Sequence, residues 1–425
     1  MKQTMSLAYG DTHIDMAFDG ARSLRVLQGK GLPPVADETQ AFLKAVGSDC
    51  VASPPLSALV STEDKVTVVV SDITRFWMRQ DRVCAQLIPY LHDALGVDYA
   101  NIVILVALGT HRPQTEQELR MLVTDKVYER VSVVNHDCMA KDLVYIGTTS
   151  WGTEVFVNPL AVGRKLIVVS GTIHHLMAGY GGGRKSILPG ISGKTTINQN
   201  HIHALSPSKP CSNPLIGMGQ LTNNPLNEDM NEAAAMASPT FGINIIMDTQ
   251  TGSSHLICGD FFRAWEQSCR EAQAMMGIPI DKKADIVVVS CGGYPKDINL
   301  YQGVKSLINA AEAVKDGGQI IFLAECREGG GAPDYFDWIR PLRAGSLDAD
   351  LRANFTIAGY IFYASCEVMV KADVLMLTQI PEATLQGMGA RVFSDINSLL
   401  KEVDCSGKDV YVMPYGGYTA PYIEG

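Results

Sequence analysis

The sequence predicts an α/β protein of two domains, each with a mixed, mostly parallel sheet flanked by helices, and an active site in the cleft between them. Two observations carry this prediction. Short apolar, β-branched runs such as KVTVVVS (65–71) and NIVILVA (101–107) alternate with helical stretches. A second series of the same kind then starts at ADIVVVS (284–290), behind a segment at 278–283 that is typical of a linker.

Composition narrows the class of protein. The chain has 425 residues, 46% of them hydrophobic, and a formal net charge of −10. The acidic balance argues against nucleic-acid binding, and no apolar run reaches the roughly 18–20 residues of a membrane span. Ten scattered cysteines without a C-x-x-C pair, and an N-terminus without an apolar signal region, predict a cytoplasmic protein with reduced thiols and no membrane association.

The first domain is expected to span residues 1–277. Alternating polar and apolar residues at 5–26 predict a hairpin or meander, and Ala36–Gly47 reads as a helix with Asp37 and Glu38 in its first turn. Further strands are predicted at 65–71, 101–107, 131–135 and 166–170, with helices at 78–95 and 114–129.

The second domain is expected to span residues 284–408 and to close over the cleft. The tail at 412–425 is expected to return to the first domain. Strands are predicted at 284–290, 318–323, 372–377 and 410–414, with a helix at 299–311.

Polar side chains follow three strands of the first domain at the point where each strand ends. Asp72, Thr74 and Arg75 follow the strand at 65–71, His111 follows the strand at 101–107, and His174 and His175 follow the strand at 166–170. Because ligands of parallel sheets bind at the carboxyl ends of the strands, these side chains are expected to converge on one crevice.

The stretch 170–203 carries four of the nine histidines, a glycine run and Lys185 directly behind that run. Glycines let a backbone approach an anion closely, so the stretch predicts a site for a phosphate-bearing cofactor beside proton or metal chemistry. The alternative is a Gly-rich turn with hydrogen-bonded histidines. A nucleoside-triphosphate loop is not indicated, because Arg184 and Leu188 stand where its glycines belong.

The predicted helix at 299–311 starts with Tyr301, Gln302 and Lys305. Tyr301 and Lys305 share a face at i, i+4 spacing, and the positive end of the helix favours an anion. An ordinary solvated lysine is the alternative.

These motifs together resemble the nickel-dependent lactate racemase family, over nearly the full length of the chain. Five separated motifs in the right order carry the resemblance: Asp72-x-Thr74-Arg75, Gly109-Thr110-His111-Arg112-Pro113, His175-x-x-Ala178-Gly179-x-x-Gly182-Gly183-Arg184-Lys185, Gly193-Lys194 leading to Asn200-His201, and Gly293-Tyr294-Pro295 leading to Tyr301-Gln302-x-x-Lys305.

The resemblance implies a nickel pincer nucleotide as cofactor, that is Ni(II)-pyridinium-3-thioamide-5-thiocarboxylic acid mononucleotide. By the resemblance, Lys185 would be joined to it covalently and His201 would bind the nickel, for which a neutral imidazole is a suitable donor. The implied cofactor-binding set is Asp72, Ile73, Thr74, Arg75, Lys185, Gln302 and Lys305.

The implied activity is that of a racemase or epimerase, an isomerase that inverts the C2 centre of a small 2-hydroxy acid. His111 and His175 would be the two general bases, one for each face, while hydride moves reversibly to the cofactor through a 2-keto acid. Because His174 adjoins His175, the two could exchange roles. The implied partners are the 2-hydroxy acid and the enzymes that build the cofactor, and a homo-oligomer is left open. The implied substrate contacts are Arg75, Tyr301, Lys305 and Tyr360.

Two departures from the family pattern concern the substrate pocket. Phe76-Trp77 stands where the lactate racemases have a proline after the arginine, and the tryptophan associated with lactate binding has no clear counterpart. Tyr360 or Phe362 is the expected replacement, so a larger hydroxy acid or a sugar acid stays open beside lactate. The alternatives to the family function are an α/β oxidoreductase without nickel and a protein that binds a phosphate ligand.

Overall fold

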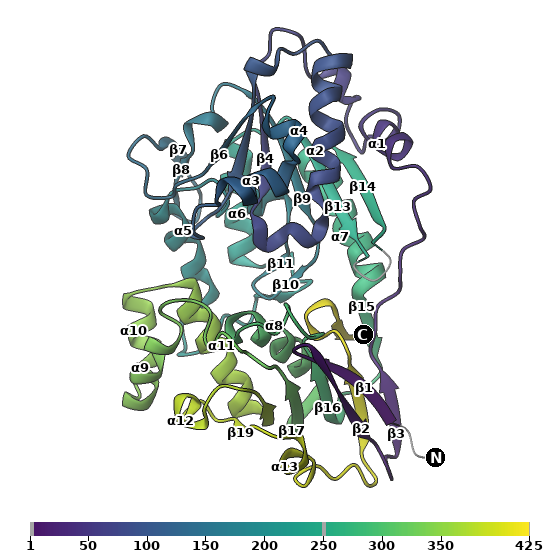
Figure 1. Cartoon of the computed structure of the whole chain (residues 1–425). Coiled ribbons are helices and arrows are strands. Elements are labelled where there is room, and N and C mark those ends of the chain that lie inside the picture. Colours follow the sequence, from purple (N-terminus) through teal and green to yellow (C-terminus); the bar gives the residue numbers. More distant parts are fainter. Residues whose placement is uncertain (1–3, 249–251, 425) are drawn as a thin grey trace. The chain divides into compact units, whose positions relative to one another are not determined.

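The computed structural model describes residues 4–248 and 252–424, which form two compact units (Figure 1). The central unit comprises residues 31–203 and 215–275. The terminal unit comprises residues up to Lys30, the segment 204–214 and the chain from Met276 onward. Within the described residues, no helix is both long and apolar enough to cross a bilayer.

A six-stranded sheet in the order β14-β13-β9-β4-β5-β6 forms the centre of the central unit. All neighbouring strands are parallel except β14, which is antiparallel to β13. The chain builds outward from β4 through β5 to β6 and then returns to the other side of β4, so a topological switch point lies between β4 and β9. The strands are β4 (Val66–Ser71), β5 (Ile102–Ala107), β6 (Ser132–Asn135), β9 (Lys165–Gly171), β13 (Phe241–Met247) and β14 (Ser254–Gly259).

The predicted strands of this sheet are confirmed. β4 and β5 are each buried at five of their six residues. Helices cover both faces of a parallel sheet, so apolar and polar residues do not alternate along its strands. The two-residue strand β10 (His174–His175) and β11 (Ala178–Tyr180) pair next to β12 (Gly217–Met218), and β7 (Val144–Thr148) pairs with β8 (Glu154–Val157).

Helix ends in the central unit follow the local capping chemistry. Asp37 caps α1 through the amide of Gln40, and Thr115 and Glu118 form a capping box at α3. The helix predicted at 114–129 is divided by Thr124, which has φ +79°. The helices are α1 (Glu38–Val46), α2 (Gln80–Pro89), α3 (Glu116–Val123), α4 (Asp125–Tyr128), α5 (Lys194–His201), α6 (Pro225–Met236) and α7 (Phe261–Met276).

The terminal unit contains a second six-stranded sheet, all parallel, in the order β19-β18-β17-β16-β20-β3. Here the chain builds from β16 toward β19 and returns beside β16 with β20, so the switch point lies between β16 and β20. The strands are β3 (Ser23–Val26), β16 (Ala284–Ser290), β17 (Val314–Leu323), β18 (Asp373–Leu377), β19 (Arg391–Phe393) and β20 (Asp409–Met413). The helices are α8 (Leu300–Ala311), α9 (Ile339–Ala344), α10 (Leu347–Ala353), α11 (Ile357–Lys371), α12 (Glu382–Leu385) and α13 (Ile396–Leu400).

Three predictions of chain organisation differ from this structure. The first 30 residues belong to the terminal unit, because β3 pairs with β20 and the hairpin β1 (Thr4–Tyr9)–β2 (Thr12–Ala17) covers the same core. The expected linker at 278–283 begins as a strand, β15 (Gly277–Ile280). The tail does not return to the central unit, because β21 (Ala420–Ile423) pairs with β15.

The assignment of the first 30 residues to the terminal unit makes a prediction for Leu7. Leu7 is 1% exposed and packs in the core of that unit. Leu7→Ala should lower the free energy of unfolding of that unit by about 2–5 kcal/mol, because it leaves a cavity. Leu43→Ala is the control, since Leu43 is 48% exposed on α1 and should change stability by about 0.5 kcal/mol or less. Denaturant unfolding of both variants measures this, and an effect of Leu7→Ala no larger than the control would contradict the boundary.

Candidate active site

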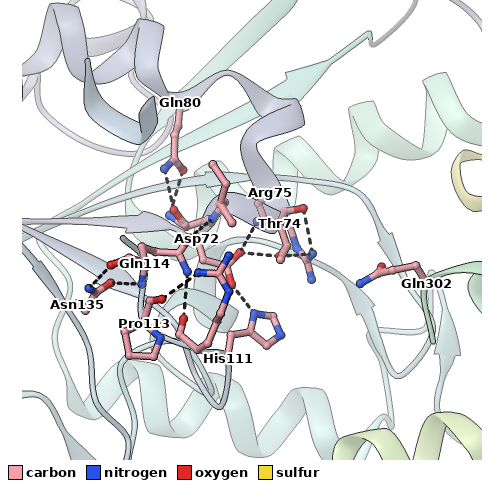
Figure 2. A network of polar contacts seen from close by, with 12 residues as sticks. Asp72, Thr74, Arg75, Gln80, His111, Pro113, Gln114, Asn135 and Gln302 are labelled. Carbon is pink, nitrogen blue, oxygen red and sulfur yellow. Dashed lines mark hydrogen bonds and ion pairs between the residues drawn. The ribbon is translucent and has the colours of Figure 1, made fainter. Parts of the chain in front are cut away.

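The carboxyl ends of β4 and β5 bring Asp72 and His111 into direct contact (Figure 2). The His111 Nδ1 donates a hydrogen bond to Asp72 Oδ2. A carboxylate can only accept, so Nδ1 carries the proton and the lone pair of a neutral His111 lies on Nε2. His111 is thereby oriented as a base, with an anion behind it to stabilise the imidazolium that forms.

Asp72 is itself held in place at the start of the 3₁₀ turn η2 (Ile73–Met78). Its Oδ1 accepts from the amide of Thr74 at 3.0 Å and from the Thr74 hydroxyl at 2.6 Å. Burial alone would raise the pKa of Asp72, but the hydrogen bond and charge of His111, with Arg75 and Thr74, outweigh it and lower the pKa below its ordinary value. Asp72 therefore stays anionic beside His111 at neutral pH.

Side-chain amides brace the backbone on both sides of this pair (Figure 2). Gln80 bonds both the amide and the carbonyl of Ser71, at 3.0 and 2.7 Å. Gln114 accepts from the amide of Ile73 at 3.1 Å, and its own backbone exchanges two 3.0 Å bonds with Asn135. The loops after β4 and β5 are thus tied to each other and to the last residue of β6.

Arg75 lies at the solvent side of the same turn. Its Nη1 donates to the Thr74 hydroxyl at 3.0 Å and to the Thr74 carbonyl at 3.4 Å. These bonds orient the guanidinium without neutralising its charge, which suits it to an anionic ligand.

His174 and His175 have different environments, as expected for consecutive residues of a strand. His174 Nε2 donates to Gln273 Oε1 at 2.7 Å, and the Tyr180 hydroxyl donates to the same oxygen at 2.8 Å. Burial lowers the pKa of His174. His174 is therefore part of the packing between β10, β11 and α7, and its geometry does not favour a role as base.

His175 Nδ1 accepts from the amides of Met177 and Ala178, both at 3.2 Å. An amide N–H can only donate, so a neutral His175 carries its proton on Nε2. His111 and His175 are thus folded as opposite tautomers, one with an acceptor and the other with a donor at Nε2.

The glycine loop is built by close backbone packing. Gly182 and Gly183 have φ +71° and +51°, and a Cβ at Gly183 would lie 2.6 Å from the Trp265 ring. Trp265 also donates to the carbonyl of Gly181 at 3.0 Å. Only glycine fits here, so the loop reaches Lys185 in one defined conformation.

Arg184, next to Lys185, is fully buried and stacks over the Trp265 ring at 3.8 Å. Its guanidinium donates to the carbonyls of Ala178 and Tyr180 and to Asn227, at 2.5, 2.9 and 2.8 Å. Burial lowers its pKa to about 9, so it remains cationic at neutral pH. Arg184 holds the loop in place through these contacts and adds positive charge beside Lys185.

His201 ends α5 and is 1% exposed. Its Nδ1 donates to the Ile197 carbonyl at 3.0 Å, and burial, followed by the positive charge of Lys185, lowers its pKa to about 3. His201 is therefore a neutral imidazole with its lone pair on Nε2. Within residues 4–248 and 252–424, no three His, Cys, Asp or Glu side chains form a group that could hold a metal ion by themselves.

The remaining predicted residues lie in the terminal unit. On α8, Lys305 Nζ donates to Gln302 Oε1 at 2.6 Å and lies 5.9 Å from the Tyr301 ring centroid. Tyr360 is 2% exposed and its hydroxyl donates to Ser212 at 3.1 Å. Tyr360 thus packs inside the terminal unit, and its contact with the substrate stays a prediction.

Comparisons with known proteins agree with this architecture. Residues 9–211 match the family model of the lactate racemase N-terminal domain, and residues 280–416 match that of the C-terminal domain. A lactate racemase from Thermoanaerobacterium thermosaccharolyticum is 32% identical over 341 residues, which cover 79% of this chain and 78% of the relative.

The chain belongs to the lactate racemase family. It is accordingly a racemase, an isomerase.

Other family relatives extend the likeness. A lactate racemase from Lactiplantibacillus plantarum is 31% identical over 67% of this chain and 66% of its own length. The solved lactate racemase apoprotein from T. thermosaccharolyticum has a TM-score of 0.87 at 26% identity, covering 99% of this chain and all of that one. A Thermotoga maritima protein of 19% identity shares the fold, with a TM-score of 0.66 over 93% of this chain.

Sequence reasoning missed two functional contacts of this family member. Asp72 was assigned to the cofactor, and its bond to His111 was not foreseen, although both residues follow neighbouring strands. Arg184 was noted as a mismatch to a nucleotide loop and as a member of the third family motif, but its burial was not foreseen. The available signal for its burial was that no carboxylate stands near this cation in the sequence.

Asp72→Asn should lower turnover of the cofactor-loaded enzyme by about 10²–10⁴-fold. Asn retains an oxygen for the Thr74 amide, so the turn should fold, but it removes the charge that holds the His111 tautomer. Asp81→Asn is the control, since Asp81 pairs with Arg79 at 2.8 Å. Initial rates and circular dichroism of both variants test this, and a folded Asp72→Asn enzyme with normal kcat would exclude the Asp72–His111 pair from catalysis.

Proposed function

We propose that this chain inverts the C2 centre of a small 2-hydroxy acid, with lactate as the first substrate to test. The observation that carries the proposal is the Asp72–His111 pair at the carboxyl ends of β4 and β5, in a member of the lactate racemase family. The two lactate racemases that it resembles support the choice of substrate class.

The residues of the central unit fit a nickel pincer nucleotide. His201 offers a neutral imidazole whose Nε2 lone pair is available in this tautomer, which is the form that binds Ni(II). Lys185, at the end of the glycine loop, is close enough for its charge to act on His201. When bound, this cofactor would accept a hydride from C2 and return it to either face.

We infer that Lys185 would carry the cofactor covalently and that His201 would bind its nickel. The cofactor-biosynthesis enzymes would have to supply it. Arg75, with Asp72, Ile73 and Thr74, and Gln302 and Lys305 in the terminal unit, would hold the phosphate or the substrate carboxylate, and Tyr301 would contact the substrate.

His111 and His175 would handle the hydroxyl proton, one for each enantiomer. His111 takes a proton at Nε2, and Asp72 stabilises the charge that results. His175 starts with a proton on Nε2, because Met177 and Ala178 occupy its Nδ1. It can act as base only after those amides release Nδ1, so the two histidines are not equivalent before the substrate binds.

The test of the function is racemisation of each pure enantiomer of lactate in D₂O by cofactor-loaded enzyme, followed by chiral chromatography and mass spectrometry. Inversion without deuterium at C2 is expected, because the hydride that leaves C2 would be returned to the same molecule and not exchange with solvent. Inversion with deuterium at C2 would contradict the hydride route, and the absence of inversion with a panel of 2-hydroxy acids would contradict the function.

The roles of the histidines make a separate prediction. His111→Ala and His175→Ala should each reduce racemisation by about 10²-fold or more while the nickel content of the protein is unchanged. His13→Ala is the control, because His13 is exposed on β2. Normal turnover of His175→Ala would overturn the scheme with two bases.

A further inference from the structure

Asp229 is a fully buried carboxylate of α6 that takes no part in the proposed proton transfer. Its Oδ1 accepts from the Thr149 hydroxyl at 2.6 Å, and its Oδ2 accepts from the Thr153 hydroxyl and the Asn200 side-chain amide, both at 2.8 Å. The same Oδ2 lies 3.9 Å from Nε2 of His203. A buried carboxylate lowers stability unless hydrogen-bond donors satisfy it, so these donors fix the groups that carry them.

Two of these partners stand on either side of His201 in the sequence. Asn200 directly precedes it at the end of α5, and His203 follows it in the 3₁₀ turn η7 (Ile202–Ala204). The Asn200 side-chain amide also donates to the Leu226 carbonyl of α6 at 3.1 Å. Helix α6 therefore faces the chain on both sides of His201 and is bonded to it at Asn200.

A different set of bonds holds the rest of α5. The Thr196 hydroxyl donates to the Glu154 carbonyl at 2.6 Å and accepts from the Phe156 amide at 3.0 Å. Gln199 Oε1 accepts from the Glu154 amide at 2.8 Å. These bonds tie α5 to β8 and do not involve Asp229. The helix should therefore remain folded without Asp229, while its last turn would lose its bond to the carboxylate.

A second carboxylate of α6 offers a matched comparison. Glu232, which follows Asp229 by three residues, accepts from the amide and the hydroxyl of Ser150 at 2.7 and 2.6 Å. Ser150 lies between Thr149 and Thr153, so both carboxylates bind the turn between β7 and β8. Among the described residues, Glu232 has no hydrogen bond to α5. A role of Asp229 that depends on α5 can therefore be separated from one that depends on the turn.

The position of His201 matters because a bond between a metal and an imidazole is short and directional. The hydrogen bond from Nδ1 to the Ile197 carbonyl sets the tautomer of the ring, but the ring moves with the backbone of the last helical turn. Loss of an outer contact that orients a metal-binding histidine typically lowers metal affinity by about 10–100-fold. Asp229 supplies such a contact one step further out, through Asn200.

We propose that Asp229 is a positioning residue for nickel: it holds the end of α5 so that the His201 imidazole keeps one position for the metal. This inference rests on the proposed function, since it takes His201 to bind nickel. It assigns Asp229 to retention of the metal, and not to proton transfer or to attachment of the cofactor.

The test uses protein produced together with the enzymes that build the cofactor. Elemental analysis and intact-mass spectrometry follow the nickel per Lys185 adduct during dialysis against a chelator. Asp229→Ala should lose nickel about 10–100-fold faster than the wild type while the adduct on Lys185 stays. Glu232→Ala is the matched control and should lose nickel at the wild-type rate. Asp229→Asn should restore most of the retention, because its side-chain oxygen can still accept from Asn200.

Hydrogen exchange of the protein without cofactor tests the same contact independently of nickel. Amides at the end of α5 should exchange faster in Asp229→Ala than in the wild type or in Glu232→Ala. Asn200→Ala removes the bond from the other side and should have the same two effects, so it decides the question if Asp229→Ala does not fold.

Nickel retention and amide exchange at wild-type levels in the folded variants would overturn the positioning role. An equal loss of nickel in Glu232→Ala would also overturn it, because the turn and not α5 would then be the cause. Faster exchange in the Asp229 variant of a protein whose wild type binds no nickel would overturn the proposed function and retain the hold of Asp229 on α5.

Discussion

The placement of the candidate site residues in this protein depends on one constraint: neighbouring parallel strands have their carboxyl ends at the same edge of the sheet. In the central unit, the switch point between β4 and β9 gathers side chains from turns that are distant in the sequence. Asp72 and His111 meet because β4 and β5 are parallel neighbours in register, with Ser71 opposite Ala107.

A second constraint is the cost of burying charge near the glycine loop. Arg184 is desolvated and has carbonyls, an amide and an indole as partners. Such a buried cation is stable only while each of its donors is satisfied, so the loop, α6 and α7 must keep their positions together. His201 is also buried, and its burial, followed by the charge of Lys185, keeps it neutral.

The sequence predicted four strands of each sheet, because buried parallel strands are short apolar runs. It did not predict β13, β14 and β19. It could not predict partners that depend on tertiary pairing. β3 was assigned to the wrong domain because its four residues, three of them exposed, carry no sign of their neighbour β20. The hydroxyl bond of Tyr360 to Ser212 was not foreseen, because it links residues 148 positions apart. The tautomer of His111 likewise follows from a contact with Asp72, which lies 39 positions away in the sequence.

The most direct test of the account is intact-mass spectrometry with nickel quantification, on protein produced together with the enzymes that build the cofactor. We expect an added mass of mononucleotide size that maps to Lys185, and about one nickel per chain that is lost in His201→Ala. An unmodified Lys185 under these conditions would contradict the cofactor assignment, and the glycine loop would then be a phosphate site without nickel.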